Sequence, residues 1–145
     1  MENVKTKSWV YNDGGRSNYF SGKAAGDCVT RAVAIASGMD YKEVYKTFAK
    51  LNASRGVAKS ARNGVYTKTK AFKDTMREWG FKWIPTMGIG TGCKVHLKAD
   101  ELPKGRIVAS CSRHYSSVID GVINDTYDPS REGTRAVYGY WIYEG

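Results

Sequence analysis

The chain has 145 residues, of which 41% are hydrophobic, and it carries a formal net charge of +9. This length supports one domain with its own core and is short for two, so we expect a single domain over residues 1–145. The hydrophobic content, with 10 Tyr and 4 Trp, excludes a disordered chain. The longest apolar run, within residues 30–38, is too short to cross a membrane.

Two features of the sequence predict a cytoplasmic protein. The first nine residues, MENVKTKSW, contain no apolar segment of the kind that directs export. The chain has 3 Cys, an odd number and too few for a disulfide scaffold, which is typical of a reducing compartment. In such a compartment a thiol serves as a core residue, a metal ligand or a nucleophile.

Helices are predicted in the first half of the chain. Apolar spacing predicts one helix from Cys28, ended by Gly38, where a glycine can adopt the left-handed conformation. Asp40 is a suitable N-cap for a second helix. A third helix is predicted over residues 67–79, with Gly80 ending it.

Strands are predicted in the second half. The runs with β-strand character are FKWIPT, GRIVAS, HYSSVI, VINDTY and VYGYWIY. Asp120 and Gly121, between two β-branched runs, predict a tight hairpin, because both residues tolerate positive φ. Helices followed by an antiparallel sheet predict an α+β domain with N-terminal helices packed on a C-terminal sheet.

The positive charge is concentrated in the middle of the chain. Between Lys42 and Lys82 there are 11 Lys and Arg against 3 acidic residues, a net of +8 that leaves about +1 for the rest. A solvated pair of Lys-rich helices explains this concentration. The alternative is a surface that binds nucleic acid or an acidic partner.

Cys28 lies where a polar loop turns into the first predicted helix. The N–H groups of a helix N-terminus favour a thiolate, and Arg31, one turn along, adds positive charge. These features favour a reactive thiol. The alternative is that Cys28 is a small buried hydrophobic residue like its alanine neighbours.

A nucleophile needs a base, and His96 and His114 are the two histidines of the chain. His114 begins a predicted strand whose hairpin returns the chain past it. With a two-residue loop at the hairpin, Asp125 shares the face of His114; with a three-residue loop, Asp128 does. Either carboxylate would orient the imidazole. Asp128 precedes a proline, so a strand-ending turn is the alternative for it.

The segment GDCVTRA at a helix start, the late strand beginning with His and the hairpin leading into Asp-Pro together resemble papain-like cysteine peptidases, especially the compact bacteriocin-processing type. The wider stretches GDCVTRAVAIASG, CKVHLKADELPKG and SRHYSSVIDGVINDTYDPS resemble a group of small bacterial and phage proteins. The first resemblance implies a papain-like fold, a peptide or protein substrate and no cofactor. It makes Cys28 the nucleophile, His114 the base and Asp128 the orienting acid, with Asp125 as the alternate.

The same resemblance raises the question of the oxyanion hole. The superfamily usually places a Gln a few residues before the cysteine, and this chain contains no Gln. Asn12, Ser17 and Asn18 in the preceding loop are the candidate substitutes, together with the backbone N–H of Cys28. The alternative function is a non-catalytic basic binding module that has kept the fold without the activity.

A zinc site is a rival use of the same histidine. Cys93-x-x-His96 and Cys111-x-x-His114 form two matching pairs that could close a tetrahedral site. Strand alternation argues against it, because Cys111 and His114 would point to opposite faces unless the chain bends. A histidine that ligates zinc cannot also serve Cys28, and we expect no metal.

Four aromatic residues cluster near the C-terminus. Strand alternation predicts that half of them lie in the core, whereas a stacking platform for bases or sugars is the alternative. They are Tyr138, Tyr140, Trp141 and Tyr143.

Overall fold

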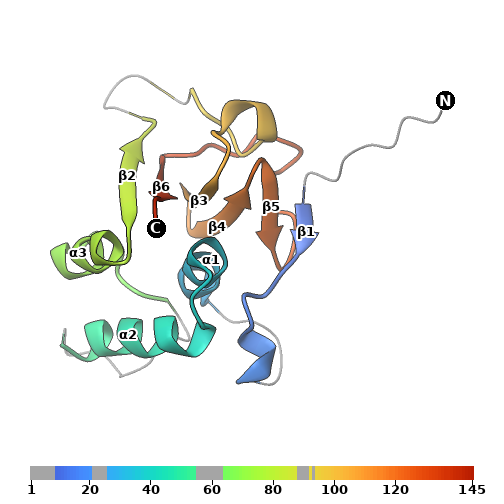
Figure 1. Cartoon of the computed structure of the whole chain (residues 1–145). Coiled ribbons are helices and arrows are strands. Elements are labelled where there is room, and N and C mark those ends of the chain that lie inside the picture. The colour runs from blue at the N-terminus through green and yellow to red at the C-terminus, as the bar shows by residue number, and fades with distance from the viewer. Residues whose placement is uncertain (1–8, 21–25, 55–63, 88–91, 93) are drawn as a thin grey trace.

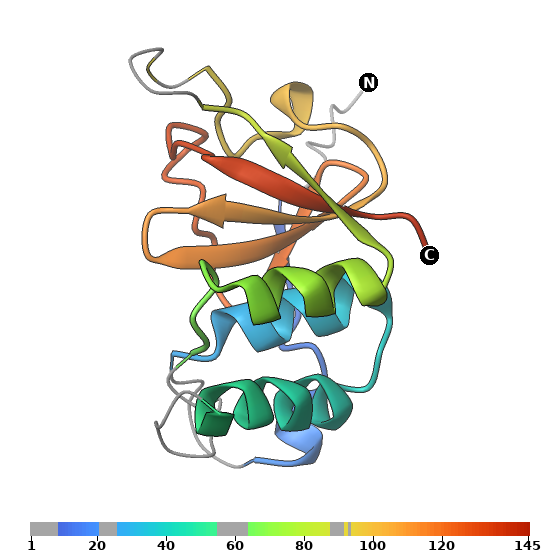
Figure 2. The ribbon, with the colours of Figure 1, turned by 90° about the vertical axis from the view of Figure 1, so that its left-hand side faces the viewer.

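The structure is a computed structural model that describes residues 9–20, 26–54, 64–87, 92 and 94–145. Within these residues the chain forms three α-helices and a six-stranded mixed sheet, a mixed α/β fold. The helices α1 and α3 lie side by side against one face of the sheet, and α2 packs on their far side (Figures 1 and 2).

The three helices are α1 (Cys28–Ser37), α2 (Tyr41–Ser54) and α3 (Lys70–Glu78). Gly38 adopts φ 76° at the end of α1, which confirms the predicted stop. The third helix begins later than predicted because the hydroxyl of Thr69 accepts the N–H of Phe72 and caps it there.

The six strands form one sheet in the order β1-β5-β4-β3-β6-β2. Their bounds are β1 (Trp9–Tyr11), β2 (Phe81–Pro85), β3 (Arg106–Cys111), β4 (His114–Ile119), β5 (Val122–Asp125) and β6 (Gly139–Tyr143). The prediction of a purely antiparallel, C-terminal sheet is wrong at one edge, where β1 pairs in parallel with β5. The N-terminal strand thereby covers an edge that the C-terminal hairpin would leave open.

Two hydrophobic cores lie on opposite faces of the sheet. Val108 of β3 packs with Val33, Phe48 and Phe72 in the core beneath the helices. Its neighbour Ile107 packs instead with the second core, because alternate residues of a strand face opposite sides. The second core is closed by the segment that contains a short 3-10 helix, η2 (Ala99–Glu101), and by residues near 137.

The β4–β5 hairpin has the two-residue loop that the sequence left open. Asp120 and Gly121 both have positive φ, 48° and 84°, which is the type I′ conformation. Ser117 consequently pairs with Asn124. Continuing this register brings Asp125 opposite Ser116, on the same face of the hairpin as His114.

Candidate active site

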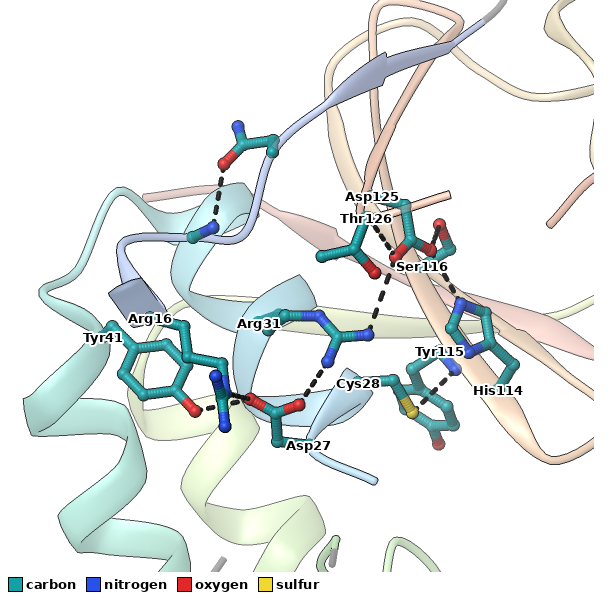
Figure 3. A network of polar contacts seen from close by, with 12 residues as sticks. Arg16, Asp27, Cys28, Arg31, Tyr41, His114, Tyr115, Ser116, Asp125 and Thr126 are labelled. Atoms are coloured by element: carbon teal, nitrogen blue, oxygen red, sulfur yellow. Dashed lines mark hydrogen bonds and ion pairs between the residues drawn. The ribbon is translucent and has the colours of Figure 1, made fainter. Parts of the chain in front are cut away.

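Cys28 is the first residue of α1, and its half-buried thiol faces the start of β4 (Figure 3). The backbone N–H of Tyr115 donates to Sγ at 3.5 Å, and the side chain of His114 lies beside the thiol (Figure 3). Two segments 86 residues apart in the sequence, at Cys28 and His114, therefore meet at this sulfur.

The surroundings of Cys28 favour the thiolate. Burial alone would raise its pKa, but the hydrogen bond to His114 and the charge of that ring, the N–H of Tyr115 and the charge of Arg31 outweigh burial and lower the pKa below its usual value of 9.0. A lowered pKa increases the thiolate fraction of Cys28 at a given pH, and the thiolate is the form that acts as a nucleophile.

His114 begins β4 and is buried, with Nε2 2.7 Å from Oδ2 of Asp125. The ring of Tyr127 covers it at a centroid distance of 5.3 Å. Burial alone would lower the pKa of His114, but its hydrogen bonds to Asp125 and Cys28 raise it to about 9. The imidazolium form of the ring is therefore stabilised by its neighbours Asp125 and Cys28.

Asp125 ends β5 and is almost completely buried. Besides His114 it accepts the hydroxyl of Ser116 at 2.8 Å and the backbone N–H of Thr126 at 2.7 Å. Burial would raise the pKa of Asp125, and these hydrogen bonds with the charge of His114 lower it. The carboxylate thus stays ionised in a buried position.

A buried ion network joins this acid to the start of α1. Arg31 pairs with Asp27 and also lies 3.7 Å from Asp125, measured from Nη2 to Oδ1. Asp27 accepts from Arg16 at 3.1 Å and from the hydroxyl of Tyr41 at 2.6 Å. Burial and the neighbouring Asp27 raise the pKa of Tyr41, so its hydroxyl remains a donor.

The sequence reasoning missed the role of Asp27. Its position directly before a helix indicates an N-cap, yet its side chain makes no capping hydrogen bond. The carboxylate is turned instead toward Arg16, Arg31 and Tyr41 (Figure 3). A signal was present in the spacing, because Asp27 and Arg31 are four residues apart, a favourable distance for a helical ion pair.

The structure places Asp125, and not Asp128, at His114. The Oδ1 of Asp128 accepts the backbone N–H of Ser130 at 3.0 Å, which is the turn that the sequence offered as its alternative. The two-residue hairpin loop is the reason, because it puts Asp125 on the face of His114.

The three oxyanion candidates do not gather at the thiol. The amide of Asn12 donates to Asn124 at 3.1 Å and its oxygen accepts from Gly14, so it serves the β1–β5 edge. Ser17 and Asn18 are exposed in the short 3-10 helix η1 (Arg16–Asn18). Among the described contacts, none joins Asn12, Ser17 or Asn18 to Cys28.

The residues of the rival zinc site are used differently. His96 bonds Glu101 through Nδ1 at 3.0 Å, and His114 is bonded to Asp125 and Cys28. Cys111 lies in the second core, where burial raises its pKa to about 11. Cys93 lies outside the described residues. In the part of the chain that the structure describes, no three His, Cys, Asp or Glu side chains are grouped to hold a metal ion.

The C-terminal aromatic residues are divided between core and surface. Trp141 is buried and Tyr138 is exposed, whereas Tyr140 and Tyr143 are half-buried.

The basic side chains between Lys42 and Lys82 are exposed wherever they are described. Eight of these Lys and Arg residues fall in described positions, and all are exposed: Lys42, Lys46, Lys50, Lys68, Lys70, Lys73, Arg77 and Lys82.

Comparison of the chain with protein-family models, with curated proteins and with solved structures found no match. Among the described helices, none has the length and apolar character needed to cross a membrane.

Proposed function

We propose that this protein is a cysteine hydrolase that cleaves an amide or thioester bond, with Cys28 as nucleophile, His114 as acid and base, and Asp125 as the orienting carboxylate. The observation that carries the proposal is the meeting of these three side chains from α1, β4 and β5: His114 bonds Asp125 at 2.7 Å, and Cys28 lies beside the ring, which lowers the pKa of the thiol (Figure 3). Peptide hydrolysis is the leading reaction.

The proposed reaction uses each of these three side chains in turn. The Cys28 thiolate attacks the carbonyl carbon, a C–S bond forms, and the carbonyl π electrons move to oxygen. As the oxyanion collapses, the C–N bond breaks and His114 gives its proton to the leaving nitrogen. Water then gives a proton to His114 while its oxygen attacks the thioester carbon. The C–S bond breaks, which releases the carboxylic acid and restores the thiolate–imidazolium pair.

The geometry of His114 supports this division of labour. Its Nε2 is bonded to Asp125, so Nδ1 is the ring nitrogen that serves Cys28. The carboxylate orients the ring and stabilises its cation, which is the third role in nucleophilic triads. For the oxyanion, we propose the backbone N–H of Cys28, because the first N–H groups of an α-helix have no partner within the helix.

The papain-like fold is part of this proposal. It is supported by a cysteine at the N-terminus of a helix that faces a histidine on an antiparallel strand. The parallel strand β1 is an addition to that expectation.

Acylation by a small ester tests the proposal. The protein is mixed with p-nitrophenyl acetate, and nitrophenol release and the mass of each cysteine-containing peptide are followed. We expect a burst and an acetyl group on Cys28, lost in Cys28→Ala and in His114→Ala. Cys111→Ser is the matched control and should retain the burst. No burst from the intact protein, or acetylation of Cys111 at the same rate, would refute the proposal.

A second candidate function, nucleic-acid binding, is favoured by the exposure of every described Lys and Arg between Lys42 and Lys82. Binding driven by phosphate contacts weakens steeply with salt, because counterions are released. Anisotropy of a labelled oligonucleotide at low and moderate salt tests it. Binding that is absent at low salt would leave the basic segment as a solvated surface.

A further inference from the structure

A cavity of about 420 Å³ adjoins the proposed active site. It lies where α3 and the turn before it meet β2, β6 and the facing ends of β3 and β4. Its volume falls in the range of small-ligand pockets, roughly 300–1,000 Å³.

Tyr115 connects this cavity to the nucleophile. Tyr115 lines the cavity, and its backbone N–H donates to Sγ of Cys28 at 3.5 Å. When the carbonyl of the bond to be cleaved lies at Cys28, a neighbouring side chain of the same substrate can therefore reach the cavity. The cavity uses none of the residues that perform the proposed chemistry.

The wall of the cavity is aromatic. Trp83, Tyr138 and Trp141 line it together with Tyr115. Trp83 and Trp141 contact each other at a ring-centroid distance of 5.2 Å. Such a wall packs against the apolar stem of a ligand.

The rim of the cavity is cationic. Lys68, Lys73 and Arg77 line it, and all three are exposed. Arg77 shares Asp74 with Lys70 on the outer side of α3. No acidic side chain is among the described residues that line the cavity, so its charge is complementary to an anion.

We propose that this cavity is a substrate subsite that binds an acidic side chain, Glu or Asp, next to the bond that Cys28 attacks. The inference rests on the proposed hydrolase function and names its substrate class. The methylene stem of the side chain packs on the aromatic wall, and its carboxylate faces Lys68 and Lys73 at the rim. A cavity beside a nucleophile for carbonyls favours a peptide over nucleic acid.

Binding without turnover tests the subsite. The Cys28→Ala protein is titrated into three fluorescein-labelled hexapeptide libraries that share all positions but one, which is fixed as Glu, Gln or Lys, and anisotropy is measured. The cations of the rim are exposed, where water and salt screen them, so we expect the Glu library to bind roughly two- to fivefold tighter than the Gln library at low salt. The Lys library should bind most weakly.

Two matched charge reversals distinguish the effect of the cavity from the effect of the protein's overall positive charge. Lys73→Glu should abolish the preference for Glu over Gln, whereas Lys70→Glu, on the same helix but outside the cavity, should preserve it. Both side chains are exposed, so circular dichroism should show the same fold for both variants. Equal binding of the three libraries, or an equal effect of the two reversals, would overturn the subsite.

The outcomes also separate the subsite from the hydrolase. The acetate ester does not need the cavity, so acylation of Cys28 with equal binding of the libraries refutes the subsite alone. Preferential Glu binding without acylation refutes the hydrolase and leaves a peptide-binding site. Tight oligonucleotide binding that Lys73→Glu weakens and Lys70→Glu does not, with no preference among the peptides, assigns the cavity to nucleic acid instead.

Discussion

The Nη2 of Arg31 lies 3.7 Å from the Oδ1 of Asp125, so the helix that begins with Cys28 places a buried cation against the carboxylate that bonds His114. Arg31 is held from its other side by Asp27. Nucleophile and acid are thereby tied together by a route separate from the histidine. Arg31 contacts no reacting atom and acts as a positioning residue.

Removing Arg31 should therefore weaken both the fold and the site. Arg31→Met leaves two buried carboxylates without their shared cation, and breaking a buried pair costs about 3–5 kcal/mol. Urea denaturation should show a loss of this size. Arg31→Lys should recover part of the lost stability. The rate of Cys28 alkylation should be highest in the unmodified protein, lower in Arg31→Lys and lowest in Arg31→Met.

The control for Arg31 is Lys70→Met, which removes an exposed ion pair to Asp74. Exposed pairs contribute little because water and salt screen them. A loss of stability equal to that of Arg31→Met would contradict the assignment of a buried network.

Two matched substitutions of aspartate by asparagine can identify the carboxylate that orients His114. Asp125→Asn should slow acylation of Cys28 by roughly 10²- to 10⁴-fold, because the imidazolium loses its carboxylate. Asp128→Asn should leave the acylation rate within experimental error, because that side chain bonds only a turn N–H among the described residues. Burst kinetics on both variants decide the question, and the reverse order would restore Asp128 as the acid.

Local rules were sufficient for much of the fold. The stop at Gly38, the three helices and the Asp120-Gly121 hairpin follow from turn chemistry and apolar spacing. The meeting of Cys28 and His114 was also anticipated, from the need of a thiol for a base. The helices and the hairpin depend on residues close in sequence, and the base had to be one of two histidines.

Contacts between segments far apart in the chain could not be predicted from the sequence. The parallel alignment of Trp9 with Ile123 leaves no local signal, since a three-residue strand has too few residues to show alternation. The choice between Asp125 and Asp128 depended on a single residue of loop length. The buried pairing of Asp27 with Arg16 and Tyr41 joins segments that only the folded chain brings together.

Residue 139 must be a glycine because Trp83, one of the two tryptophans that line the cavity, lies against it. A Cβ at Gly139 would lie 2.3 Å from Cζ2 of Trp83, which no real contact allows. Gly139→Ala should destabilise the protein by about 1–3 kcal/mol, as overpacking does.

A double-mutant cycle isolates this contact. In a Trp83→Ala background the added methyl has room, so Gly139→Ala should cost much less there. Thermal denaturation of the four proteins gives the coupling. Equal costs in both backgrounds would show that strain elsewhere in β6 is responsible.

The pH dependence of Cys28 should report its pairing with His114. The pKa of Cys28 is lowered below 9.0, so its alkylation by iodoacetamide should reach a plateau at a lower pH than that of an ordinary thiol. Cys111, whose pKa is raised to about 11, should react little below pH 9.

The pKa of His114 is raised to about 9 from 6.5, so the folded protein binds this proton more tightly than the unfolded chain does. Its contribution to stability is therefore complete below pH 6.5 and is lost as the pH rises through about 9. His114→Ala should move the alkylation profile of Cys28 to higher pH and remove this part of the pH-dependent change in melting temperature. An unchanged profile in His114→Ala would mean that the thiolate is stabilised by the Tyr115 N–H and Arg31 alone.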